Sequence, residues 1–146
     1  MTTDLLLALA HHALAFTLLA LIAVEFALLH KSVAPAMVRT LASLDAAYGA
    51  TAGLLVVVGF GRVFKGAKGA EFFLHNPVFW AKLAFFLAVG LVSIAPTLRF
   101  LRWKRAARAD AGFTPTAAEV AATRRWLLAE LALFVPIPLL AAAMAR

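Results

Sequence analysis

The stretch LLLALAHHALAFTLLALIAVEFALL, residues 5–29, decides the fold, because its only ionisable side chains are His11, His12 and Glu25. A helix needs about 20 apolar residues to cross about 30 Å of hydrocarbon, so this run predicts a membrane-spanning helix. The run is too long for the apolar region of a signal peptide, and Asp4 is the only charged side chain before the histidines. We therefore expect a helix that is retained in the protein.

Three further apolar stretches follow, at about residues 46–61, 77–98 and 126–145, in a chain that is 64% hydrophobic and 14% charged. A soluble domain of this length needs a larger polar surface. The prediction is an all-α integral membrane four-helix bundle that forms a single domain over residues 1–146. Its expected helices cover about residues 4–30, 44–62, 77–103 and 116–145.

Basic residues are distributed unequally between the two ends of such a bundle. Nine of the 14 Lys and Arg side chains lie in or beside loops 31–44 and 99–125, whereas four lie at the opposite end and Lys82 lies inside the third stretch. The positive-inside rule then predicts that both termini lie outside the cytoplasm. We expect these cations to contact lipid headgroups rather than nucleic acid.

The first loop also carries a helical pattern. In KSVAPAMVRTLASLD, residues 31–45, the apolar side chains of Val33, Met37, Leu41 and Leu44 recur at helical spacing. This pattern predicts a short helix that lies in the membrane interface.

Three of the four histidines are expected on one side of the membrane. His11 and His12 lie near the outer end of the first helix, and His75 lies just before the outer end of the third. Neighbouring residues on a helix diverge by about 100°, so one of the paired histidines can face the bundle while the other does not. We favour His12 as the inward residue.

Imidazoles in this setting suggest a bound cofactor, and haem b is the leading candidate. The chain has no cysteine, which excludes c-type haem attachment, iron–sulfur clusters and thiolate ligation. We expect His12 and His75 as axial ligands, His11 as the alternate ligand, and Arg62 and Lys65 as partners of the haem propionates. The expected function is electron transfer or redox chemistry near the outer face, with a quinone or a small oxidant as reaction partner.

Two other interpretations stay open from the sequence. The histidines can serve as interface anchors in a non-enzymatic membrane helper or transport protein, or they can bind zinc or copper together with a carboxylate. The small-residue pattern from Gly49 to Gly53 also favours close helix packing and predicts a homodimer.

A second polar group is expected nearer the cytoplasm. Glu25, Asp45, Tyr48 and Glu130 fall at similar depth near the inner ends of three of the helices. Ionisable groups in hydrocarbon either form pairs or carry a function. Ion pairs that tie the helix ends together and a proton-conducting or quinone-facing site are both compatible with this pattern.

Residues 44–64, LDAAYGATAGLLVVVGFGRVF, residues 75–103, HNPVFWAKLAFFLAVGLVSIAPTLRFLRW, and the paired histidines resemble a bacterial family of predicted membrane proteins, domain of unknown function 2214. The resemblance covers nearly the whole chain. It implies a small four-helix protein of the bacterial inner membrane, and it transfers no catalytic residue.

Overall fold

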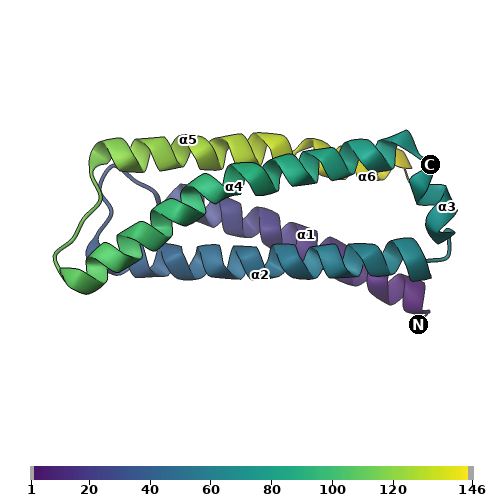
Figure 1. The fold of residues 1–146 in the computed structure, drawn as a ribbon, viewed down its shortest axis with the longest axis horizontal. Coiled ribbons are helices and arrows are strands. Elements are labelled where there is room, and N and C mark those ends of the chain that lie inside the picture. Colours follow the sequence, from purple (N-terminus) through teal and green to yellow (C-terminus); the bar gives the residue numbers. More distant parts are fainter. Residues whose placement is uncertain (1, 145–146) are drawn as a thin grey trace.

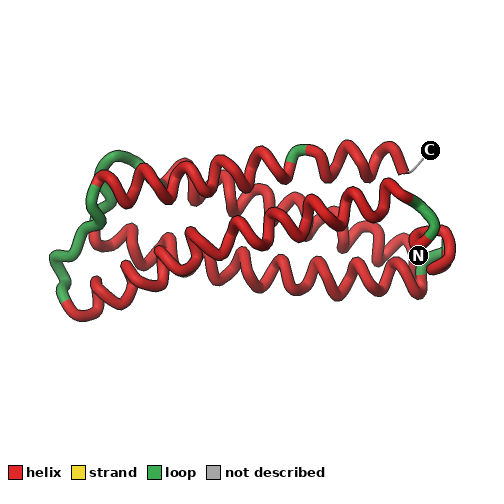
Figure 2. Tube along the Cα trace, turned by 45° about the horizontal axis from the view of Figure 1, so that its top comes forward, coloured by secondary structure: helices red, strands yellow, loops and turns green. Residues whose placement is uncertain are grey.

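Four long helices run side by side in the computed structural model, which describes residues 2–144 (Figure 1). The elements in chain order are α1 (Thr3–Leu28), α2 (Pro35–Lys65), α3 (Gly69–Leu74), α4 (Pro77–Ala109), α5 (Ala117–Phe134) and α6 (Pro136–Met144). The described residues contain no strand, and apart from the break between α5 and α6 the loops gather at the two ends of the bundle (Figure 2). The predicted all-α class is confirmed.

The four spans predicted from the sequence are present. Helix α1, helix α2, helix α4 and the α5–α6 pair are each long and apolar enough to cross a membrane. Large apolar side chains cover the outside of the bundle; Phe16, Val57, Leu91 and Leu139 are each at least 67% exposed. Such a surface is stable in hydrocarbon and unfavourable in water. The chain is therefore a multi-pass membrane protein.

The expected interfacial helix in the first loop is wrong. Residues 35–44 form the first turns of α2, which continues without a break to Lys65. Pro35 occupies the start of the helix, where its missing N–H costs nothing, and α2 ends only at Gly66. Val38 and Leu41 are fully buried in the bundle, so the helical pattern reports core packing rather than membrane-surface binding.

The last predicted helix, residues 116–145, is divided in two. The α-helical hydrogen-bonding pattern is interrupted at Val135, between α5 and α6. Pro136 has no N–H to donate, and its ring crowds the preceding turn. The predicted end at residue 145 lies outside the described residues.

The helices do not pack equally along their lengths. Helix α1 packs against α2 and α5, and α4 packs against α2, α5 and α6, but within the described residues no Cα atom of α1 lies within 8 Å of one in α6. The core, which includes Leu18, Ile22, Leu127 and Phe100, lies where α1 and α5 are close. Towards the α3 end, α1 stays beside α2, with Leu7 next to Gly61 and Asp4 accepting a hydrogen bond from the Ala67 N–H, while it diverges from α5 and α6 (Figure 1).

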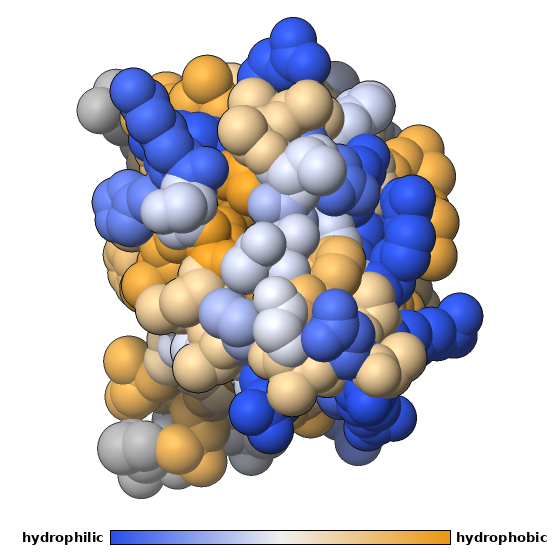
Figure 3. Space-filling model, turned by 90° about the vertical axis from the view of Figure 1, so that its left-hand side faces the viewer, coloured by the Kyte–Doolittle hydropathy of each residue, from blue (hydrophilic) through white to orange (hydrophobic). Residues whose placement is uncertain are grey.

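Both described ends of the chain lie at the α3 end of the bundle (Figure 1). The opposite end carries the loops around residues 30–34 and 110–116, and Figure 3 shows hydrophilic side chains spread over it. Which end faces the cytoplasm remains a prediction from the distribution of basic residues.

Candidate functional site

A cavity of about 190 Å³ lies at the α3 end, where α1 has separated from α6. We call it the α3-end cavity. Its polar lining is entirely basic among the described residues: His11, His12, Arg62, Lys68 and Lys82. The rest of the wall includes Phe16, Phe73, Phe134, Pro138 and Met144. An apolar cavity with a few convergent cationic groups is suited to a largely apolar ligand that carries negative charge.

His11 faces the interior of the bundle. The ring is half-buried, and its Nδ1 atom is shielded from solvent without a hydrogen-bond partner in the described structure. The ring lies beside α2, since a Cβ atom added at Gly59 would be 3.5 Å from His11 Cε1. A buried imidazole nitrogen without a partner is available to bind a metal or a ligand.

The expectation that His12 faces the bundle is wrong. His12 is exposed, and its Nδ1 atom lies 2.7 Å from the Ala8 carbonyl oxygen of its own helix. The buried residues of α1 are Leu18, Ile22 and Glu25. Counted back from these residues, the helical repeat reaches His11, which leaves His12 exposed, although it still lines the cavity.

His75 does not line the α3-end cavity. It caps the C-terminus of α3, is exposed, and places its Nδ1 atom 2.9 Å from the Glu71 carbonyl oxygen. Residues 2–144 contain no group of three His, Cys, Asp or Glu side chains arranged for a metal ion. The structure therefore does not bring His12 and His75 together at the cavity, and ligation by this pair is still only a prediction from sequence.

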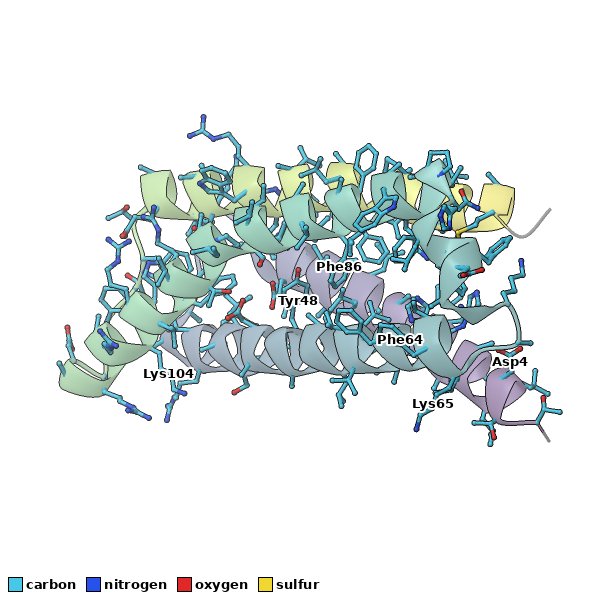
Figure 4. The ribbon with its side chains drawn as sticks, turned by 45° about the vertical axis from the view of Figure 1, so that its right-hand side comes forward. Asp4, Tyr48, Phe64, Lys65, Phe86 and Lys104 are labelled. Carbon is cyan, nitrogen blue, oxygen red and sulfur yellow. The ribbon has the colours of Figure 1, made fainter. Side chains whose placement is uncertain are left out.

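Of the two cations predicted to bind the haem propionates, Arg62 lines the cavity and Lys65 does not. The Arg62 Nε atom is buried at the cavity without a hydrogen-bond partner. Lys82, which the sequence left unassigned, joins it there, with its Nζ atom 5.8 Å from the centre of the Phe79 ring. Lys65 is exposed, points away from the bundle and does not line the cavity (Figure 4). Lys82, rather than Lys65, thus accompanies Arg62.

A second site lies deeper in the bundle, nearer the opposite end. Glu25, Asp45 and Glu130, which we call the carboxyl cluster, are 1%, 8% and 1% exposed. They lie near enough for their charges to interact. Asp45 accepts a hydrogen bond from Thr97 at 2.8 Å, whereas one carboxyl oxygen each of Glu25 and Glu130 has no partner among the described residues.

Neighbouring cations are engaged elsewhere. The Arg124 guanidinium donates to the Phe26 and Leu29 carbonyl oxygens at 3.0 and 2.8 Å, and Arg99 pairs with Glu119 at 3.4 Å. Among residues 2–144 no ion pair involves the carboxyl cluster, so the structure does not form the ion pairs that the sequence allowed as one interpretation.

The family model for predicted membrane proteins, DUF2214, matches residues 3–146. The chain belongs to this family. The match spans both sites, and the family description assigns neither an activity nor a ligand to them. No match was found among curated proteins or among solved structures.

In this DUF2214 protein, an open groove of about 480 Å³ runs between α2 and α4 beside the carboxyl cluster. Gly49, Gly53 and Gly90 leave the space, and a Cβ atom added at any of them meets nothing within 4 Å. The polar residues that line it are Asp45, Tyr48, Ser93, Thr97 and Lys104. Figure 4 shows Tyr48 between the helices and Lys104 towards the basic end. Sequence reasoning missed Ser93 and Thr97, although their spacing of four places two hydroxyls on one face of an apolar helix.

Proposed function

We propose that this protein binds haem b in the α3-end cavity and takes part in electron transfer or redox chemistry in the bacterial inner membrane. His11 would ligate the haem iron, and Arg62 and Lys82 would hold the propionates. One observation carries the proposal: an inward-facing imidazole nitrogen without a partner shares a cavity with Arg62, Lys68 and Lys82, and no carboxylate of the described residues lines it.

The donor set fits the group. Haem b requires an imidazole for its iron, an apolar wall for its ring and cations for its propionates. Phe16, Phe73 and Phe134 supply the wall. The enclosed volume of about 190 Å³ is smaller than a porphyrin, so the gap between α1 and α6 must accept part of the ring.

The residues around the cavity have separable tasks. His11 would bind the haem iron and orient the ring. Arg62 and Lys82 would neutralise the negative charge of the propionates in a region of low dielectric, and the aromatic wall would exclude water. Haem, when bound, supplies reversible one-electron chemistry at its iron. We propose that a lipid-soluble electron partner such as a quinone reaches the cavity from the membrane between α1 and α6, which both line it.

The distribution of basic residues supports an orientation. With the heavily basic end in the cytoplasm, the α3-end cavity and both termini lie at the outer face. We also propose a homodimer that packs through exposed Gly49 and Gly53, for which native mass measurement in lipid is the test.

Two alternative functions would be told apart from haem binding by the colour and metal content of the purified protein. A zinc or copper site has weaker support, because residues 2–144 hold no suitable group of three ligands. A helper or transport role predicts a colourless protein without stoichiometric metal.

The test uses a matched pair of neighbouring histidines. The protein is purified from haem-replete cells, and absorption spectra are recorded in the oxidised and reduced states for wild type, His11→Ala and His12→Ala. We expect a strong Soret band that His11→Ala abolishes and His12→Ala preserves, because His11 is half-buried with an unpartnered Nδ1 atom, whereas His12 also lines the cavity but is exposed and has its Nδ1 atom at its own helix. A colourless wild type, or loss of the band in His12→Ala alone, would overturn the assignment.

A further inference from the structure

We infer that the carboxyl cluster is a proton-binding site inside the membrane. It exchanges protons with water at the end of the bundle opposite α3, which carries most of the basic residues, through the groove between α2 and α4. This inference does not depend on haem, because it rests on residues at a different depth. It assigns protons as the ligands of the Glu25 and Glu130 carboxyls, each of which has an oxygen atom without a hydrogen-bond partner among the described residues.

The first step concerns the charge balance of the site. Glu25 and Glu130 are 1% exposed, and one carboxyl oxygen of each has no hydrogen-bond partner among the described residues. Leaving a carboxylate ionised in such a place is costly unless a cation or several donors neutralise it. The cluster therefore requires a neutralising ligand that the described side chains do not provide.

The second step considers the groups that face the cluster from each packed helix. Helix α1 contributes Glu25, helix α2 contributes Asp45 and Tyr48, and helix α5 contributes Glu130, with the Tyr48 hydroxyl close to the Glu130 carboxyl. Helix α4 contributes the Thr97 hydroxyl, which donates to Asp45 at 2.8 Å. No basic side chain of the described residues forms an ion pair with the cluster. Arg124 of α5 is bound to carbonyl oxygens at the end of α1, and Lys104 of α4 lines the groove together with Asp45 without pairing with it.

The third step identifies the ligand. Residues 2–144 contain no group of acidic or histidine side chains arranged for a metal ion, so the carboxyl oxygens do not converge on a common point. Protons need no shared coordination sphere, since each binds a single oxygen atom. A carboxylate that gains a proton also becomes a donor, which supplies a hydrogen bond that its neighbours lack.

The fourth step is access. Asp45 and Tyr48 belong to the cluster region and also line the groove, whose lining includes Lys104. The groove is open and measures about 480 Å³, and the polar side chains of Ser93, Thr97 and Lys104 offer water hydrogen-bond partners along it. A proton from water can therefore reach Asp45 and pass to the neighbouring carboxyls, with the same path returning it.

The experiment is infrared spectroscopy of the full-length protein in lipid vesicles at neutral pH, in H₂O and after transfer to D₂O. The expected result is a carbonyl-stretch band of protonated carboxyl groups that shifts in D₂O. Glu25→Gln and Glu130→Gln each remove part of this band, while Glu71→Gln, which changes an exposed carboxyl on α3, leaves it unchanged. Near-identical amide and carboxyl shapes keep the variants folded, which circular dichroism verifies.

A groove-filling variant tests the path. Gly90→Leu adds a side chain where a Cβ atom meets nothing, so we expect slower H/D exchange of the band without loss of its intensity. The oligomeric state is measured first, because a second copy seated in the groove also slows exchange.

Three results would overturn the inference. The first is the absence of a protonated-carboxyl band, which together with stoichiometric Na⁺, K⁺ or Ca²⁺ by elemental analysis would assign the cluster to a metal cation. The second is a band that neither glutamate substitution reduces. The third is exchange that Gly90→Leu does not slow, which would remove the groove as the path.

Discussion

Arg124 offers the sharpest test of how the bundle is held together. Its guanidinium donates to the carbonyl oxygens of Phe26 and Leu29 at 3.0 and 2.8 Å, and it lies 3.9 Å from the centre of the Phe26 ring. These carbonyls belong to the C-terminal end of α1, where the helix has no N–H groups of its own to satisfy them. Arg124 therefore fastens α5 to the end of α1.

The expected loss in Arg124→Ala follows from these contacts. A hydrogen bond from a charged donor contributes about 1.5–3 kcal/mol, and an arginine over an aromatic ring adds about 1 kcal/mol. All the contacts come from one side chain that is only partly buried, so they do not add fully. We expect a decrease of about 3 kcal/mol in the free energy of unfolding, measured by SDS titration in mixed micelles with circular dichroism.

Arg125→Ala is the matched control. Arg125 is adjacent to Arg124 and exposed. Its removal takes one positive charge from the same end of the bundle, so both variants change the distribution of basic residues across the membrane equally. We expect Arg125→Ala to remain within about 0.5 kcal/mol of wild type. Similar losses in the two variants would show that charge, rather than the contacts with α1, governs the effect.

Three further predictions test separate parts of the structure. Thr116→Ala removes the side chain of the capping box at the start of α5 and should lower the free energy of unfolding by about 1 kcal/mol, measured by the same titration. The chain has no cysteine, so a membrane-impermeant maleimide should label Ala67→Cys but not Ala111→Cys in intact spheroplasts; the reverse pattern would invert the proposed orientation. Gly59→Leu, which places a side chain against the histidine ring on α1, should lower haem content, whereas Gly53→Leu, which meets nothing within 4 Å, should not; equal haem content would place the cofactor elsewhere.

The fold was largely predictable because hydrocarbon imposes a strong constraint. A long apolar run with few charges has few stable alternatives to a spanning helix, and the helix expected from residue 116 begins at Ala117, behind a capping box of Thr116 and Glu119. The interfacial helix was mispredicted because a helical pattern alone does not reveal what covers it. Val38 and Leu41 satisfy the same spacing whether they face lipid headgroups or the core of the bundle.

The sites were predicted less completely, since they depend on which face of each helix turns inward. The choice between His11 and His12 required the buried stripe of α1, which only the packing of Leu18, Ile22 and Glu25 defines. Depth along the helices was enough to group Glu25 with Glu130. Depth did not reveal that Arg124 donates to carbonyl oxygens at the end of α1. The sequence therefore could not decide whether the carboxyls form ion pairs or a proton-binding site.

Helix α1 carries one residue of each proposed site, and this arrangement makes a joint prediction. His11 and Glu25 are separated by about 21 Å along the axis and by about 40° around it. At that distance one charge changes the energy of another by about 0.8 kcal/mol with an effective dielectric constant near 20, which corresponds to about 35 mV for a one-electron couple. If haem and proton both bind as proposed, ionisation of the cluster lowers the haem midpoint potential by a few tens of mV as pH rises, because negative charge stabilises the oxidised iron. Redox titration of wild type and of Glu25→Gln across pH measures this coupling. A pH dependence that is identical in the two proteins would show that the sites act independently, even where each proposal holds alone.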